Sequence, residues 1–170
     1  MARTVEISLP ATSFIPASTN GAQFVAHLHN SLTRPALAFD AGADEFVVSV
    51  PLVMPASYAA GDVKVDIFFY SASANSGTAA WNVTLEAITA STDTLDLEAT
   101  SSLPAVTAGT HSIDSTTAGD LRKVSITLSA TSKDSVAAGD QMRLGLSRDE
   151  SADSVSGDLF VPFVVLYEGT

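Results

Sequence analysis

Three histidines and several acidic residues are the side chains of this sequence that could bind a metal ion. His27 and His29 are two residues apart, so a strand would place both imidazoles on the same face. The chain has no cysteine, and no acidic residue lies close to these two histidines in the sequence. We therefore expect His27 and His29 to belong to a polar strand face. We assign no metal ligand and no cofactor.

The densest acidic segment spans residues 149–158. Asp149, Asp153 and Asp158 could supply carboxylate oxygens to Ca²⁺, which prefers such ligands. Their spacing differs from that of an EF-hand loop, and turn formation in water explains the same residues. Whether this loop binds calcium stays open at the level of sequence.

Neighbouring carboxylates are the second kind of chemistry to consider. Glycoside hydrolysis needs two carboxyl groups at a set separation, and the pairs Asp44-Glu45 and Asp149-Glu150 lie in turn-like contexts. The sequence contains no G-x-S-x-G, P-loop, G-x-G-x-x-G or H-E-x-x-H motif. We predict that the protein is not an enzyme and has no catalytic residue.

Charge and hydropathy exclude two classes of partner. The net charge is −11, and no Lys or Arg occurs between Lys64 and Arg122. A nucleic-acid-binding surface requires clustered basic residues, so we expect no nucleic-acid partner. No apolar run reaches the ~18 residues of a membrane span, and the N-terminus lacks a signal-peptide pattern. We expect a protein that is made in the cytoplasm and does not contact a membrane.

Alternating apolar residues indicate the fold. The dipeptide Gly-Asp occurs at residues 61–62, 119–120, 139–140 and 157–158, each time before a run with a period of two. Glycine accepts a positive φ and aspartate forms turns, so the dipeptide should end one segment and start a strand. Similar runs begin near Val5, Phe46 and Trp81, and we expect Trp81 at the core or its rim. Many short strands predict an all-β fold, a two-sheet antiparallel β-sandwich of jelly-roll type.

The last strand differs from the others because both of its faces are apolar. Strict alternation would place Phe160, Pro162, Val164 and Leu166 on one face and residues 159, 161, 163, 165 and 167 on the other. Proline favours an edge or a bulge, and an apolar edge strand needs a cover. Two interpretations stay open: a loop of the same chain covers the strand, or Phe160, Pro162, Val164 and Leu166 form an oligomer or capsid interface.

Two regions lack a clear strand pattern. Residues 11–22 look like an irregular connection, and residues 87–119 like a long excursion that is rich in Ser, Thr and Ala. We expect one domain overall. Residues 1–34 would form an N-terminal arm and the first strands, and residues 35–170 the jelly-roll-like sandwich.

The order of several motifs resembles virion structural proteins of tailed bacteriophages. The similar stretch covers roughly residues 35–168 and includes FVVSVPLVMP, VKVDIFFYSASANSG, AWNVTLE, DSVAAGDQMRLGLSRDESADSVSGD and LFVPFVVLYE. The resemblance implies a jelly roll that serves as a capsid decoration (cement) protein, a head fibre or a tail component, often as a trimer. It implies no catalytic residue.

Two functions follow as predictions. The first is a capsid decoration protein on the capsid exterior of the virion, a homotrimer that bridges subunits of the major capsid protein. The alternative is a tail-fibre or receptor-binding module that recognises carbohydrate on the host surface through aromatic residues and long loops. The absence of sequence repeats and of a coiled-coil pattern favours the first function over a fibre.

Overall fold

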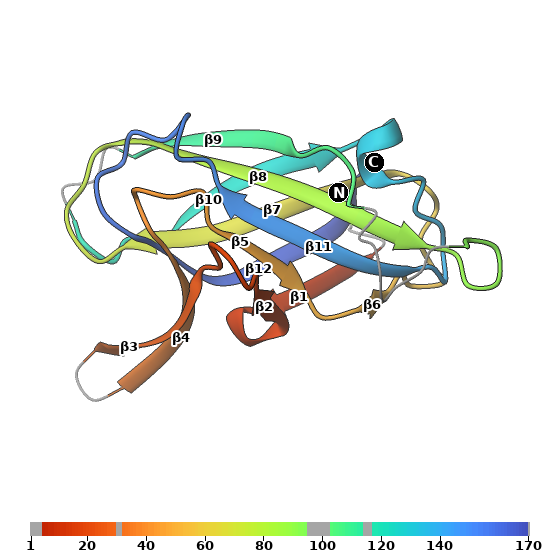
Figure 1. Cartoon of the computed structure of the whole chain (residues 1–170), viewed down its shortest axis with the longest axis horizontal. Coiled ribbons are helices and arrows are strands. Elements are labelled where there is room, and N and C mark those ends of the chain that lie inside the picture. Colours follow the sequence, from red (N-terminus) through yellow and green to blue (C-terminus); the bar gives the residue numbers. More distant parts are fainter. Residues whose placement is uncertain (1–4, 30–31, 95–102, 114–116, 170) are drawn as a thin grey trace.

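A computed structural model of the chain describes residues 5–29, 32–94, 103–113 and 117–169. These residues form two six-stranded antiparallel sheets that pack face to face, as the sequence predicts (Figure 1). Helical structure in this part of the chain amounts to two short 3₁₀ turns, η1 (Ala11–Ser13) and η2 (Ala130–Lys133). Neither turn is long enough to cross a membrane.

Each sheet contains strands from distant parts of the sequence. Sheet A has the order β10-β7-β12-β4-β3, with β1 also paired to β12. Sheet B has the order β2-β5-β11-β8-β9, with β6 also paired to β11. The strands of sheet A are β1 (Glu6–Pro10), β3 (Gln23–His29), β4 (Leu32–Phe39), β7 (Asp62–Ser71), β10 (Arg122–Leu128) and β12 (Leu159–Gly169). The strands of sheet B are β2 (Phe14–Pro16), β5 (Phe46–Ser49), β6 (Leu52–Val53), β8 (Gly77–Ile88), β9 (Thr107–Ile113) and β11 (Gln141–Arg148).

The Gly-Asp dipeptides act as the sequence predicts. Each lies at or just before the start of a strand: β7, β10, β11 or β12. Glycine has a positive φ at Gly119, Gly139 and Gly157, whereas Ala60 adopts it at the first site, with a φ of 64°. The Asp140 carboxylate accepts a hydrogen bond from the Ala137 backbone N–H at 2.8 Å, which closes the turn before β11.

The core lies between the two sheets and includes Trp81, which is fully buried as expected. Trp81 on β8 packs edge-on against Phe39 of β4, with ring centroids 5.1 Å apart. Phe69 of β7 contacts the same indole at 5.5 Å. Aromatic side chains of sheet A therefore pack on the tryptophan of sheet B, and this joins the two layers.

Strand β12 is a central strand. It pairs with β7 along one side and with β4 and then β1 along the other. Residues of the N-terminal region are thus part of the sandwich: β1 pairs with β12 and β2 pairs with β5. The boundary that the sequence suggested between residues 34 and 35 falls inside β4. The inner face of β12 packs into the core, and its other face forms part of the outer face of sheet A.

A bulge in β12 corrects the predicted faces of this strand. The register against β7 shifts between Phe160 and Phe163, and Pro162 lies inside that shift. Leu159 and Val161 belong to the core before the bulge, and Val164 and Leu166 belong to it after the bulge. The prediction that residues 160, 162, 164 and 166 share one face is therefore wrong, because strict alternation ends at the bulge.

Other sequence predictions are refined by the structure. The run that begins at Phe46 divides into β5 and β6, and the predicted excursion over residues 87–119 contains β9. Residues 95–102 of that excursion lie outside the described residues. Strands β3 and β4 form a hairpin that projects from the body of the sandwich (Figure 1).

Candidate functional site

The outer face of sheet A carries two pairs of aromatic side chains. Tyr70 of β7 stacks on Phe160 of β12, with centroids 5.4 Å apart and an interplanar angle of 21°. Phe68 and Phe163 of the same strands stack at 4.4 Å and 25°. The register places these pairs next to each other along the two strands. We call Phe68, Tyr70, Phe160 and Phe163 the aromatic patch.

The bulge creates the aromatic patch. Residues 160 and 163 would point to opposite sides of a regular strand, because side chains alternate. The register shift around Pro162 brings Phe160 and Phe163 to the same side. Phe160 and Tyr70 are buried, at 8% and 7% exposed, whereas Phe68 and Phe163 are half-buried, so solvent reaches the patch mainly at the second pair. Burial raises the pKa of the Tyr70 hydroxyl, although the nearby positive charge of Arg34 lowers it in part.

A polar cluster adjoins the aromatic patch on the same face. Asp66 of β7 accepts hydrogen bonds from the Ser125 hydroxyl at 2.6 Å and from the Tyr167 hydroxyl at 3.3 Å. Lys123 donates to the same carboxylate at 3.1 Å. Asp66 is almost fully buried although it points outward, because these neighbours lie over it. Lys64 lies opposite Tyr167 in the register and is half-buried. We call Lys64, Asp66, Lys123, Ser125 and Tyr167 the polar cluster.

Together, the aromatic patch and the polar cluster form a continuous strip along β7 and β12. From Tyr70 to Lys64 the strip spans about 20 Å, at about 3.3 Å per residue. Ring faces and edges offer dispersion contacts with C–H groups, whereas the hydroxyl, ammonium and carboxylate groups offer hydrogen bonds. Such a strip can bind a ligand that is apolar on its flat side and polar at its edge.

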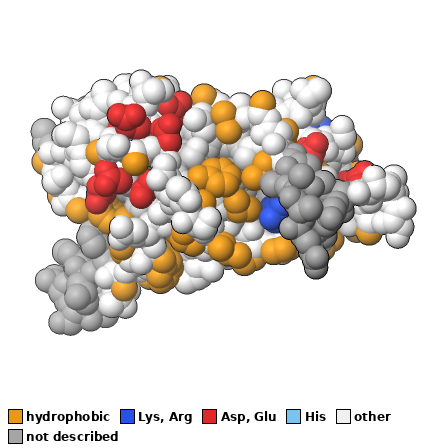
Figure 2. Space-filling model, viewed as in Figure 1, with side chains coloured by type: hydrophobic (Ala, Val, Ile, Leu, Met, Phe, Trp, Pro, Cys, Tyr) orange, Lys and Arg blue, Asp and Glu red, His pale blue; other side chains and the backbone are white. Residues whose placement is uncertain are grey.

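The outer face of sheet B differs in its side chains. Ile15 of β2 is 58% exposed, and it lies beside Val48 of β5. A Cβ atom added to Gly145 would lie 2.8 Å from the ring of Phe46, so that ring covers the backbone of β11. Figure 2 looks onto this side of the molecule, where hydrophobic side chains gather near the middle.

Polar groups of the sheet B outer face are paired within the chain. Arg143 donates a hydrogen bond from its Nε to the Glu86 carboxylate at 2.5 Å, and Glu86 is fully buried. The Glu86 carboxylate in turn raises the pKa of Arg143. The Thr84 hydroxyl donates to the backbone oxygen of Pro104 at 2.8 Å, which holds the segment before β9 against this face.

The predicted interface residues do not come together. Val164 and Leu166 point into the core and are at most 2% exposed. Phe160 lies on the outer face of sheet A, in a small cluster with Tyr70 and Ala36. Pro162 lies in the bulge. Of the predicted set, the aromatic patch contains Phe160 alone. Sequence reasoning missed Phe163, for which the signal was the proline one position before it.

The acidic loop 149–158 is organised around a buried arginine. Arg148 is fully buried and donates to the Asp153 carboxylate at 2.8 and 3.0 Å. It also donates to backbone oxygens of Phe39, Val155 and Gly157. The Asp149 carboxylate accepts from Asn82 and from Ser151, and these bonds lower its pKa. Hydrogen bonds that hold this loop in place thus account for the carboxylates of Asp149 and Asp153. Groups of acidic and histidine side chains suited to a metal ion are absent from the described residues.

The neighbouring acidic residues Asp44-Glu45 and Asp149-Glu150 also take part in hydrogen bonds that stabilise loops. Asp44 accepts a hydrogen bond from the Glu150 backbone N–H at 2.7 Å, so the two pairs lie close in space. Glu45 accepts from the Asp40 backbone N–H at 2.7 Å, and burial raises the pKa of Glu45. The backbone of His27 and His29 lies in β3, and their side chains are outside the described part of the chain.

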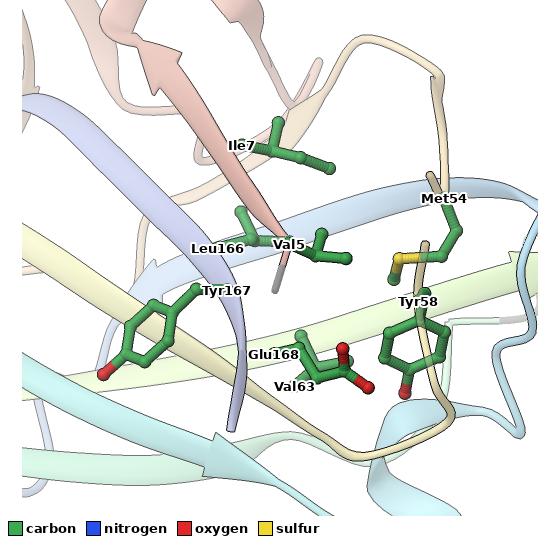
Figure 3. A pocket seen from close by; sticks show the side chains of 8 residues that line it. All are labelled: Val5, Ile7, Met54, Tyr58, Val63, Leu166, Tyr167 and Glu168. Carbon is green, nitrogen blue, oxygen red and sulfur yellow. The ribbon is translucent and has the colours of Figure 1, made fainter. Parts of the chain in front are cut away.

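A small hollow near the end of β12 is too narrow for a ligand. Its volume is about 10 Å³, which is close to the volume that one water molecule needs (Figure 3). Polar groups that line the hollow form hydrogen bonds with the backbone of the neighbouring loop. The Tyr58 hydroxyl donates to the Gly61 oxygen at 2.5 Å, and the Glu168 carboxylate accepts from the Ala59 N–H at 2.8 Å.

Comparisons with known proteins support the fold. Neither the protein-family models nor the curated proteins include a match to this chain. Among solved structures, the chain is similar to the xylanase 10B modules of Clostridium thermocellum, solved with xylohexaose. The identity is 13%, the TM-score is 0.51, and the match covers 99% of this chain and 28% of that one.

Two further similar structures have nearly the length of this chain. The CBM22-2 xylan-binding domain of Paenibacillus barcinonensis Xyn10C has 13% identity and a TM-score of 0.50, with 96% of this chain and 99% of that chain covered. The xylan-binding module CBM15 has 10% identity and a TM-score of 0.50, with 98% of each chain covered. At these identities the likeness establishes a common fold: the chain is a β-sandwich of the jelly-roll type found in carbohydrate-binding modules.

Proposed function

We propose that this protein is a non-catalytic carbohydrate-binding module and that the sugar lies on the outer face of sheet A. The observation that carries the proposal is the strip in which the aromatic patch adjoins the polar cluster. Sugar rings present C–H groups on their faces and hydroxyl groups at their edges. The two halves of the strip match these two kinds of group.

The similar structures support this proposal through their own ligands. One was solved with xylohexaose, and the names of two others describe xylan binding. A further similar structure, at 14% identity and a TM-score of 0.50, is specific for non-crystalline cellulose. These ligands are chains of sugar rings, and an extended strip along two strands suits such a chain.

Net charge restricts the ligand. At −11, the protein repels polyanions over the distance that salt leaves unscreened. The polar cluster holds two lysines, but Lys123 is engaged with the Asp66 carboxylate. We therefore expect neutral glycans to bind in preference to uronic-acid polymers.

Titration calorimetry with xylohexaose, cellohexaose and mannohexaose tests the proposal, with oligogalacturonate as the charged control. Phe163→Ala and Phe163→Leu should each weaken binding about tenfold, about 1.4 kcal/mol, because both remove a ring of the patch. The leucine variant keeps most of the packing volume and so separates loss of the ring from loss of stability.

Phe46→Ala is the matched control. This phenylalanine is also half-buried but lies on the outer face of sheet B, so its removal should leave affinity unchanged. The proposal fails if none of the glycans binds, or if Phe46→Ala and Phe163→Ala weaken binding equally.

The capsid decoration role stays a prediction. So do the homotrimer, the major capsid protein as partner and the place on the capsid exterior. The interface expected for that role included Val164 and Leu166, which the core contains. A carbohydrate-binding face agrees better with the alternative prediction, a module that recognises surface carbohydrate.

A further inference from the structure

Most edge strands of the two sheets carry features that prevent pairing with another chain. Natural proteins protect edges with short strands, prolines or charges, and glycine weakens a strand. Strand β2 has three residues and ends at Pro16, and β6 has two residues. Strand β10 begins with Arg122 and Lys123, and β1 ends at Pro10. Strand β9 is longer, but it contains Gly109.

Strand β3 has none of these protective features. Its seven residues, QFVAHLH, include no proline, glycine, acidic residue, lysine or arginine. It is the last strand of sheet A, and no described strand pairs with its outer edge. Phe24 on this strand is 50% exposed. Edge strands without protective features are templates for pairing with another strand.

The partner strand shows which backbone groups point outward. Ala26 lies opposite Pro35 of β4, and proline has no amide hydrogen. That pair therefore cannot be one of the hydrogen-bonded pairs, which alternate along an antiparallel ladder. It follows that the N–H and C=O groups of Phe24, Ala26 and Leu28 point toward the open edge.

We propose that β3 pairs in antiparallel fashion with β3 of a second copy of this chain, across a two-fold axis at Ala26. In this register Ala26 lies opposite its own copy and Phe24 opposite Leu28. The outward groups of all three residues then form hydrogen-bonded pairs. The strand is complementary to itself, as a two-fold interface requires.

Charge favours a second copy in this place. All 19 acidic residues lie outside residues 23–39, and the net charge of each copy is −11. Two copies that approach through their β3–β4 hairpins keep their acidic bodies apart, which reduces the repulsion between them. The projection of the hairpin from the sandwich leaves room for this approach (Figure 1).

Pairing of this kind would join the two copies of sheet A into one sheet. A two-fold axis perpendicular to the sheet keeps both outer faces on the same side. If that face binds glycan as proposed above, the dimer presents two strips to one polysaccharide or surface. Two linked sites bind a repeating ligand more tightly than one site does.

Sedimentation equilibrium of the full chain tests the pairing. We expect about twice the chain mass of 17.5 kDa. Ala26→Pro removes an outward N–H without touching the β3–β4 ladder, and this variant should be a folded monomer whose melting temperature does not rise with protein concentration. Ala26→Val keeps the N–H at the same position and should remain dimeric. A monomeric full chain, a trimer, or a dimeric Ala26→Pro variant would overturn the proposal.

Binding measurements separate this proposal from the proposed function. Monomeric Ala26→Pro should bind a short oligosaccharide in solution as well as the full chain does, but should bind polysaccharide on beads at least tenfold more weakly. A dimer that binds no glycan would refute the proposed function and leave the pairing intact. Equal binding of the two forms to the beads would show that the two strips do not act together.

Discussion

The two outer faces of the sandwich use the same strand pattern in different ways. On sheet B, the outward residues include aliphatic side chains and the Arg143–Glu86 ion pair, and Thr84 binds the segment before β9. On sheet A, the outward residues of β7 and β12 form two stacked aromatic pairs beside a polar cluster. Side chains alternate between the inner and outer face in both sheets. The two outer faces therefore differ in the kinds of side chain that they carry.

The difference suggests that sheet B stabilises the fold and sheet A binds ligand. The Arg143–Glu86 ion pair on sheet B, whose carboxylate is fully buried, stabilises the fold chiefly because it keeps the Glu86 charge paired. A half-buried ring on sheet A contributes less to stability, because solvent still reaches part of it. Substitutions on the two faces should therefore separate stability from binding.

Arg143→Ala should have the largest effect. It leaves the buried Glu86 carboxylate without its guanidinium partner, and we expect a loss of about 3 kcal/mol in the free energy of unfolding. Urea denaturation at pH 7 measures this loss. Glycan affinity of the folded variant should stay the same.

Lys123→Ala is the matching substitution on sheet A. The Lys123 side chain is 45% exposed, and Ser125 and Tyr167 continue to donate to Asp66. The loss of stability should be about 1 kcal/mol or less. If Lys123→Ala destabilises the fold as much as Arg143→Ala, the two faces do not differ as proposed.

Removal of one hydroxyl from each face should have a smaller effect. Thr84→Val breaks the bond to Pro104 and should cost about 1 kcal/mol of stability without changing affinity. Tyr167→Phe removes a longer bond to Asp66, so stability should change less. Its affinity for glycan should fall about threefold, because a hydroxyl of the polar cluster is lost. Thermal melts and calorimetry on both variants give the comparison, and a Thr84→Val variant that binds less tightly would contradict it.

The smallest effect concerns pH. Burial raises the pKa of Tyr70 above its ordinary value of 10.0. The unfolded chain then ionises first, so stability from this group is present below pH 10 and is lost as pH rises through the folded pKa. Tyr70→Phe removes the hydroxyl and therefore this loss of stability at high pH. Unfolding free energies at pH 9, 10 and 11 should fall less steeply for the variant, and equal slopes would show that Tyr70 is not the group responsible.

Local chemistry made much of this fold predictable. The Gly-Asp dipeptides mark the starts of β7, β10, β11 and β12, because turn formation depends on residues that are adjacent in sequence. The alternation after each dipeptide identified core residues such as Val65 and Leu144. The sequence also placed Trp81 at the core or its rim, since this residue begins an apolar face.

The candidate site was less predictable because it depends on pairing between distant strands. One extra residue at the Pro162 bulge moves Phe163 from the expected face of β12 to the other. A prediction that assumes strict alternation of side chains does not include such an extra residue. Nor does the sequence indicate that β7 lies between β10 and β12, which brings Ser125 and Tyr167 to Asp66. Pro162 indicated where the strand could be irregular, but not which residues after it would point into the core.

The central position of β12 has a consequence for synthesis on the ribosome. Strands β7, β4 and β1 all border β12, which follows all three in the sequence. Until it emerges, the earlier strands of sheet A have no shared neighbour, and the layer cannot close over the tryptophan. Assembly of this layer therefore waits until β12 has been made, and a chain that stops before Leu159 would expose apolar inner surfaces to chaperones and proteases.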